Sequence, residues 1–213
     1  MSLNFETMNF GKYQTEFLNL GVKEVPHQRG GIAQSEALMI YTLIKELGVD
    51  VLIESGVRNG KSTEIWGLTL SDVKVYALDA AGKFGVKESK MSTITNTKKR
   101  LKNYEHIEFL YPVNSHLKIP ELISENEDKR IGIFIDGPKG TEGFDLCRNL
   151  LNHKSVHFTA QHDYTFTNDK KHMATRSWQQ FYPNSNWREI ADSFDKDVKY
   201  NKSNGPGLYC TIK

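Results

Sequence analysis

A glycine-containing loop with charged neighbours, residues 53–63, is the first place in this 213-residue chain where chemistry could occur. Its sequence, IESGVRNGKST, follows a short apolar run and precedes a segment of helical character. Ser55, Gly60, Lys61 and Ser62 differ at one position from the GxxxxGK[ST] pattern, whose amides and lysine hold phosphate groups. The loop therefore predicts a ligand site, and a nucleotide held through phosphate by Lys61 is one interpretation. A tight strand-to-helix turn that binds nothing is the structural alternative.

Acidic residues beside the loop favour a different ligand. Asp79 lies 23 residues after Gly56, close to the offset of about 20 at which an acid accepts hydrogen bonds from ribose hydroxyls. A triphosphate site needs no such acid, and Glu54 would tolerate a cationic group better than a polyphosphate. The pattern therefore predicts a nucleoside held across the first two strands.

Alternating strands and helices must position these residues. The predicted strands are short, β-branched or aromatic, and nearly continuously apolar, as strands buried on both faces are; they span 50–54, 73–79, 107–111, 131–136 and 155–160. Helix-compatible segments lie between them, at 60–70, 90–103, 117–125 and 141–152. This order predicts an α/β fold with a mostly parallel, doubly wound, Rossmann-like sheet and helices on both faces.

Further elements flank this core. A helix ending at Gly48 precedes the first strand, and a helix near 172–182 follows the fifth. The segments WREIADSF and GLYCTIK fit a closing hairpin. We expect one domain over 1–213, with an N-terminal extension over 1–30, a binding core over 31–165 and a C-terminal helix and hairpin over 166–213.

The ends of the remaining strands carry polar residues as well. Ligands of open α/β sheets bind beyond the carboxyl ends of the strands. Asn114 and Ser115 follow the third strand, Asp136 ends the fourth, and His162 with Asp163 follows the fifth. The segment IGIFIDG would also pass as the metal-holding strand of a P-loop nucleoside triphosphatase, so this alternative stays open.

From about residue 30 to 165, the chain resembles class I methyltransferases that use S-adenosylmethionine (SAM). The stretch from Glu54 to Ser62 resembles the E-x-G-x-x-x-G-x-S loop of the small O-methyltransferases, and Asp79 matches their ribose-binding acid. The resemblance implies a sheet of about seven strands whose last strand is antiparallel, a place that GPGLYCTIK would fill. It implies cofactor contacts from Glu54, Gly56, Gly60, Ser62, Asp79, Asn114, Ser115 and Asp136.

One branch of this superfamily depends on a divalent cation, as catechol, caffeoyl-CoA and macrocin type O-methyltransferases do. The resemblance assigns its metal positions to Asp136, His162 and Asp163, and its general-base lysine to Lys139 in DGPK. Mg²⁺ would lower the pKa of a bound hydroxyl. His162 departs from the usual carboxylate, and imidazole suits Mn²⁺, Fe²⁺ or Zn²⁺ better than Mg²⁺. Either the metal differs, or no metal binds and His162 is the general base. A structural alternative also stays open, in which His162 is a hydrogen-bonded loop residue, Asp163 caps the next segment and Lys139 is a solvated turn side chain.

Composition limits the classes of partner. The net charge of +2 gives no general field for nucleic acid. No apolar run reaches the roughly 20 residues that span a bilayer, and the first residues lack a signal pattern, so we expect a cytoplasmic protein. Cys147 and Cys210 are expected to be reduced thiols.

The sequence thus predicts a SAM-dependent O-methyltransferase acting on a small acceptor such as a sugar or phenol. Tyr164, Phe166 and Trp178 could line the acceptor pocket. The resemblance makes a homodimer plausible. A catalytically inactive SAM-binding module is a further alternative.

Overall fold

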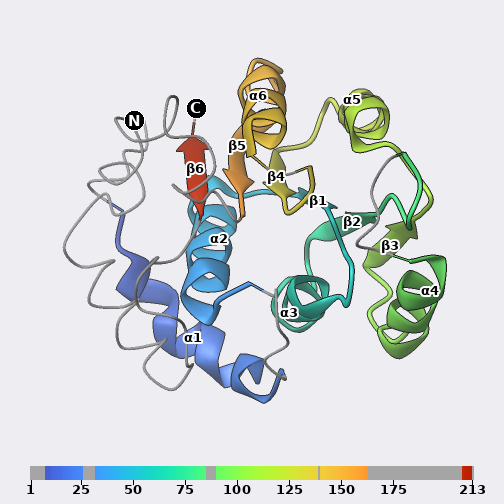
Figure 1. Cartoon of the computed structure of the whole chain (residues 1–213). Helices are drawn as coiled ribbons and strands as arrows, with labels where there is room; N and C mark the ends of the chain where they lie inside the picture. Colours follow the sequence, from blue (N-terminus) through green and yellow to red (C-terminus); the bar gives the residue numbers. More distant parts are fainter. Residues whose placement is uncertain (1–7, 26–31, 85–89, 139, 163–207, 213) are drawn as a thin grey trace.

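A computed structural model describes residues 8–25, 32–84, 90–138, 140–162 and 208–212 of the chain (Figure 1). Its strands are β1 (Val51–Ser55), β2 (Lys74–Leu78), β3 (Ile107–Leu110), β4 (Ile131–Ile135), β5 (Val156–Gln161) and β6 (Tyr209–Ile212). Its α-helices are α1 (Gln14–Asn19), α2 (Gln34–Leu47), α3 (Lys61–Thr69), α4 (Met91–Arg100), α5 (Ser115–Glu125) and α6 (Gly140–Leu150). Short 3₁₀ turns, η2 (Phe10–Tyr13) and η3 (Val22–Glu24), flank α1.

The strands form one sheet in the order β3-β2-β1-β4-β5-β6. Neighbours from β3 to β5 are parallel, and β6 runs antiparallel to β5. The predicted α/β class, the parallel core and the antiparallel last strand are therefore confirmed. The described residues contain six strands, where about seven were predicted. The predicted hairpin strand WREIADSF and the predicted helix near 172–182 lie outside the described residues.

Helices cover both faces of the sheet, and strand alternation decides which side chains meet them (Figure 1). Along β1, Leu52 packs into the cluster that includes α2 and α3. Val51 and Ile53 point the other way, into the cluster with α5 and α6. Strands buried on both faces account for the continuous apolar runs in the sequence.

The chain order of the strands reverses between β1 and β4, because β2 and β3 lie to one side of β1 and β5 and β6 lie beyond β4. A crevice opens at such a switch point, outside the carboxyl ends of the strands. The loop after β1 and the segment after β4 border this position.

Helix α2 is buried on nearly all sides, unlike an ordinary surface helix. The N-terminal segment covers its outer side, since the ring of Phe17 in α1 packs 5.3 Å from that of Tyr41. The helix ends at Gly48, whose φ of +59° is left-handed. Glu36, in its first turn, is buried as well. No helix in the described part of the chain has the length and apolar character to cross a bilayer.

Candidate functional site

Two glycines shape the loop between β1 and α3. Gly56 has a φ of +99°, and a Cβ there would lie 2.9 Å from the carbonyl carbon of Asp136 after β4. Gly60 has a φ of +71°, and a Cβ there would lie 2.3 Å from the Cγ2 atom of Thr97. Both positions need glycine for conformation and for space. The predicted ligand loop therefore lies against the end of β4, at the switch point of the sheet.

Asp79, directly after β2, organises the loops on either side of it. Its carboxylate accepts hydrogen bonds from the amides of Arg58, at 2.9 Å, and Ala81, at 2.6 Å. Arg58 and Ala81 have φ values of +49° and +52°, which L-residues adopt at a cost of about 1–2 kcal/mol. The acid thus stabilises two strained turns. The structure brings Asp79 to the glycine loop, and its contact with a ribose stays a prediction.

The loop amides are arranged poorly for a phosphate ligand. Those of Gly56, Arg58 and Gly60 donate to oxygen atoms of the chain itself, at 2.8, 2.9 and 2.7 Å. A phosphate cradle needs such amides to point at the ligand. Lys61 is only 5% exposed at the start of α3. These contacts count against the phosphate interpretation of the loop.

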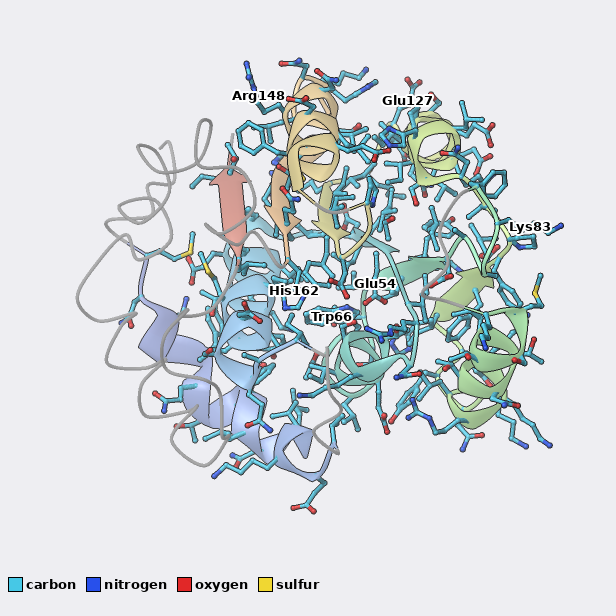
Figure 2. All side chains as sticks on the ribbon, in the orientation of Figure 1. Glu54, Trp66, Lys83, Glu127, Arg148 and His162 are labelled. Atoms are coloured by element: carbon cyan, nitrogen blue, oxygen red, sulfur yellow. The ribbon has the colours of Figure 1, made fainter. Side chains whose placement is uncertain are left out.

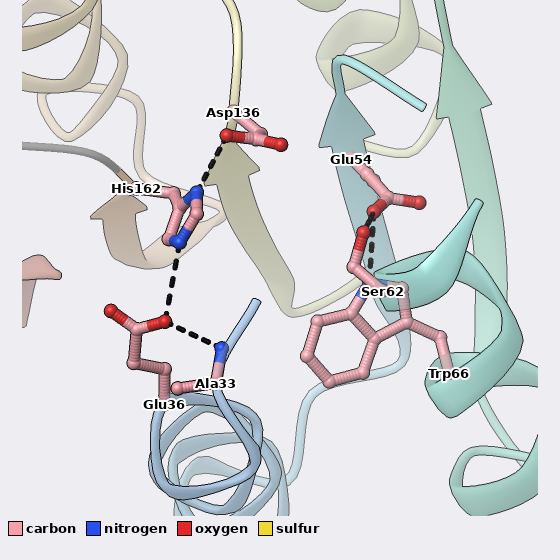
Figure 3. Close-up of polar contacts among 7 residues, drawn as sticks. All are labelled: Ala33, Glu36, Glu54, Ser62, Trp66, Asp136 and His162. Atoms are coloured by element: carbon pink, nitrogen blue, oxygen red, sulfur yellow. Dashed lines mark hydrogen bonds and ion pairs between the residues drawn. The ribbon is translucent and has the colours of Figure 1, made fainter. Parts of the chain in front are cut away.

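Glu54 is turned inward, toward α3. It lies on the same side of β1 as Leu52 and is fully buried. Its oxygens accept hydrogen bonds from Ser62 Oγ and, at 3.2 Å, from Trp66 Nε1 (Figure 3). Thr63 Oγ1 also donates to Glu54, at 2.7 Å. Burial raises the pKa of Glu54 to about 7, against the opposing effect of the hydroxyl donors. Glu54 and Ser62 therefore join α3 to β1, and their predicted cofactor contacts are untested.

Ser55 faces the opposite side and joins three strand ends. Its hydroxyl lies 2.6 Å from Ser115 Oγ and donates to the carbonyl of Gly137. Asn114 caps α5 by accepting a hydrogen bond from the amide of His116, at 3.0 Å. The predicted residues Asn114 and Ser115 thus lie close to the glycine loop. The joining role of Ser55 was not predicted.

A buried histidine lies between two carboxylates on the α2 side of the sheet. His162 Nδ1 is 2.7 Å from Asp136 Oδ1, and His162 Nε2 is 3.2 Å from Glu36 Oε2 (Figure 3). The same Glu36 oxygen accepts a hydrogen bond from the amide of Ala33 at 2.8 Å. Burial lowers the pKa of His162, but the two carboxylates outweigh it and hold that pKa well above its ordinary value.

The charged residues of the candidate site are buried, unlike the charged residues of the protein surface. Figure 2 shows Glu54 and His162 in the interior, whereas Lys83, Glu127 and Arg148 lie at the periphery. The sequence did not single out Glu36. A glutamate three residues into a helix predicts a cap, but no local signal predicts its contact with a histidine 126 residues later.

Comparison with known proteins adds the fold family. No protein-family model matches the sequence, and no curated protein matches it significantly. A structure described as a "putative O-methyltransferase" from Klebsiella pneumoniae is 12% identical, covers 95% of this chain and 88% of its own, and has a TM-score of 0.52. A "putative caffeoyl-CoA O-methyltransferase" from Staphylococcus aureus is 19% identical, covers 98% of each chain and has a TM-score of 0.51. The chain shares the fold of these two structures, which agrees with the class I SAM-dependent methyltransferase resemblance seen in the sequence.

Within this methyltransferase fold, the predicted cation site is only partly described. Asp136 and His162 lie together, while Lys139 and Asp163 fall outside the described residues, as do Tyr164, Phe166 and Trp178. Among the residues that are described, no three His, Cys, Asp or Glu side chains are arranged to hold a metal ion. The ring of His162 lies between Asp136 and Glu36 and contacts both, and the predicted position of Asp163 is untested.

Proposed function

We propose that this protein is a SAM-dependent methyltransferase that transfers a methyl group to a hydroxyl oxygen of a small acceptor, such as a sugar or a phenol. The observation that carries the proposal is the glycine loop, which lies against the end of β4 and is bound through its backbone to Asp79. The loop, the acid and the switch point occur together in a sheet of the order β3-β2-β1-β4-β5-β6.

The charges around this crevice support a cationic ligand without phosphate. Glu54, Asp79 and Asp136 follow one another along the carboxyl ends of β1, β2 and β4. Asp136 is the most accessible of the three, with 15% of its side chain exposed. Asp79 is the carboxylate that contributes most to this preference, because His162 offsets the charge of Asp136 and Glu54 is buried against α3; a carboxylate stabilises a nearby cation and repels a polyphosphate. SAM fits this set, because it has a sulfonium cation and no phosphate group.

The residues of the chain would share the work of binding. The loop over 56–60 and Asp79 would hold the nucleoside, and the ends of β3 and α5, at Asn114 and Ser115, would border its base. When bound, SAM supplies an electrophilic methyl group. The task of the protein is then to hold the acceptor oxygen in line and to remove its proton.

We assign the proton-removing role to Lys139, three residues after Asp136 in the sequence. A general base needs an available lone pair. His162 is less suited to this role, because each of its ring nitrogens contacts a carboxylate oxygen. A lysine near a developing alkoxide would also stabilise the negative charge.

Calorimetric titration tests the binding part of the proposal. We expect SAM and S-adenosylhomocysteine (SAH) to bind at micromolar concentrations and ATP to give no heat. Asp79→Asn should weaken SAH binding about tenfold or more, because a hydrogen bond to a charged group contributes about 1.5–3 kcal/mol. Asp72→Asn is the matched control, since Asp72 is an exposed acid before the start of β2. Binding of ATP without SAM or SAH would instead support the nucleotide-binding alternative.

Turnover separates an enzyme from a binding module. Protein incubated with SAM and a panel of sugars and phenols should form SAH with at least one acceptor, and Lys139→Ala should reduce the rate. If SAH formation is unaffected by Lys139→Ala, the general base lies elsewhere. If SAH binds but no acceptor is methylated, the inactive SAM-binding module becomes the better description.

A further inference from the structure

His162, Asp136 and Glu36 come from three separate elements and meet on one side of the sheet. His162 follows β5, Asp136 follows β4, and Glu36 lies in the first turn of α2 (Figure 3). Glu36 is 1% exposed and His162 is 2% exposed. A buried carboxylate is costly unless a cation or hydrogen-bond donors face it. The ring of His162 therefore faces both carboxylates and offsets part of the cost of burying them.

Both ring nitrogens of His162, one of which a metal would need as a ligand, contact carboxylate oxygens instead. A metal-binding imidazole offers a nitrogen lone pair to the ion. In this structure both ring nitrogens of His162 are within 3.2 Å of a carboxylate oxygen, the distance of a hydrogen-bonded pair. Asp136 Oδ1 is already in contact with Nδ1 of the ring. These residues consequently do not fit the cation site that the family resemblance assigned to Asp136 and His162.

We propose that the side chain of His162, held by Glu36, takes the place of a divalent cation beside Asp136, so that this protein binds no metal there. The inference rests on the proposed methyltransferase function, because that family provides the metal position being compared. Glu36 acts as a positioning residue, since it holds the ring from the side opposite Asp136 and is itself fixed by the amide of Ala33. The ring then donates to the Asp136 carboxylate at the position where a metal would contact it, with at most half of the metal's charge.

The test is a titration of the intact protein with MnCl₂ in the presence of saturating SAH. We expect no heat and no change of unfolding temperature for the wild type at about 1 mM Mn²⁺, a concentration that occupies even weak oxygen-ligand sites. SAH affinity should be the same with EDTA. Stoichiometric Mn²⁺ binding to the wild type would overturn the proposal. Failure of SAH to bind at all would count against the methyltransferase function itself.

A variant designed to gain metal binding tests directly whether the ring of His162 takes the place of the metal. His162→Asp removes the ring that contacts both carboxylates and adds the carboxylate that the resemblance assigns to this position. We expect Mn²⁺ to bind this variant and raise its unfolding temperature by about 2–4 °C. His162→Asn is the matched control, because it removes the ring without adding a carboxylate, and it should gain no response to Mn²⁺. If His162→Asp folds but does not respond to Mn²⁺, the ring is not what replaces the metal. If His162→Asp does not fold, the MnCl₂ titration of the wild type decides whether the proposal holds.

Discussion

Replacing Glu54 by glutamine should make the protein more stable at alkaline pH and leave it nearly unchanged at acid pH. Glu54 is fully buried, and burial raises its pKa from an ordinary value of 4.5 to about 7. Between these values the unfolded chain has released the proton while the folded chain retains it. The unfolded state therefore binds fewer protons, and a rise in pH favours unfolding.

The magnitude follows from the separation of the two pKa values. Each pKa unit corresponds to about 1.4 kcal/mol, so the interval from 4.5 to about 7 represents about 3 kcal/mol of stability. This contribution is fully present below pH 4.5 and is lost as the pH rises through about 7. Glutamine has no such titration. Its amide can donate to Thr63 Oγ1 and its oxygen can accept from Ser62 and Trp66, as protonated Glu54 can.

Urea unfolding followed by tryptophan fluorescence, at several pH values from 4.5 to 8, measures this effect. The free energy of unfolding of wild type minus that of Glu54→Gln should fall by about 3 kcal/mol across the range. Taking the difference between the two proteins cancels the contributions of the other titrating groups to the pH dependence. Glu54→Ala is the control, because it leaves three buried donors without an acceptor and should destabilise at every pH. A difference that is constant with pH, or that rises with it, would refute the reasoning.

The remaining predictions concern conformation and contacts. Gly60→Ala should lower the free energy of unfolding in urea by about 2–4 kcal/mol, since it adds a clash with a threonine methyl group to the left-handed strain. Gly48→Ala is the control, with a similar φ of +59° and only a flexible arginine side chain at 3.4 Å, and it should lower that free energy by about 1–2 kcal/mol. Equal losses in the two variants would contradict the role of the clash. Ser55→Ala should lower stability by about 1 kcal/mol and weaken SAH binding, because its two hydrogen bonds join the strand ends. Glu36→Gln should lower the free energy of unfolding by about 3–5 kcal/mol and lower the thermal midpoint, because it breaks a buried pair with His162. Glu142→Gln is the control, since its pair with a histidine is exposed, and it should leave the thermal midpoint nearly unchanged. Similar shifts of the midpoint in the two variants would show that burial does not decide the effect.

Local sequence patterns were sufficient for the secondary structure of the core. The predicted strands at 50–54 and 131–136 are observed as Val51–Ser55 and Ile131–Ile135. Apolar runs and helical spacing act over a few residues, so the order of elements can be read without knowing their neighbours. The same holds for the glycine loop, since left-handed backbone at Gly56 and Gly60 favours this residue type wherever the loop lies.

Tertiary structure decided what the charged residues at the strand ends contact. The sequence places Glu54 beside the glycine loop, but only the packing of α3 on β1 turns it inward, to three donors of that helix. Glu36 and His162 are 126 residues apart in the chain and meet because α2 and the end of β5 share one side of the sheet. Sequence spacing alone determined which residues reach the edge of the sheet. The protonation and partners of those residues depend on burial and on charges brought together by folding, and these are properties of three-dimensional neighbours rather than of spacing.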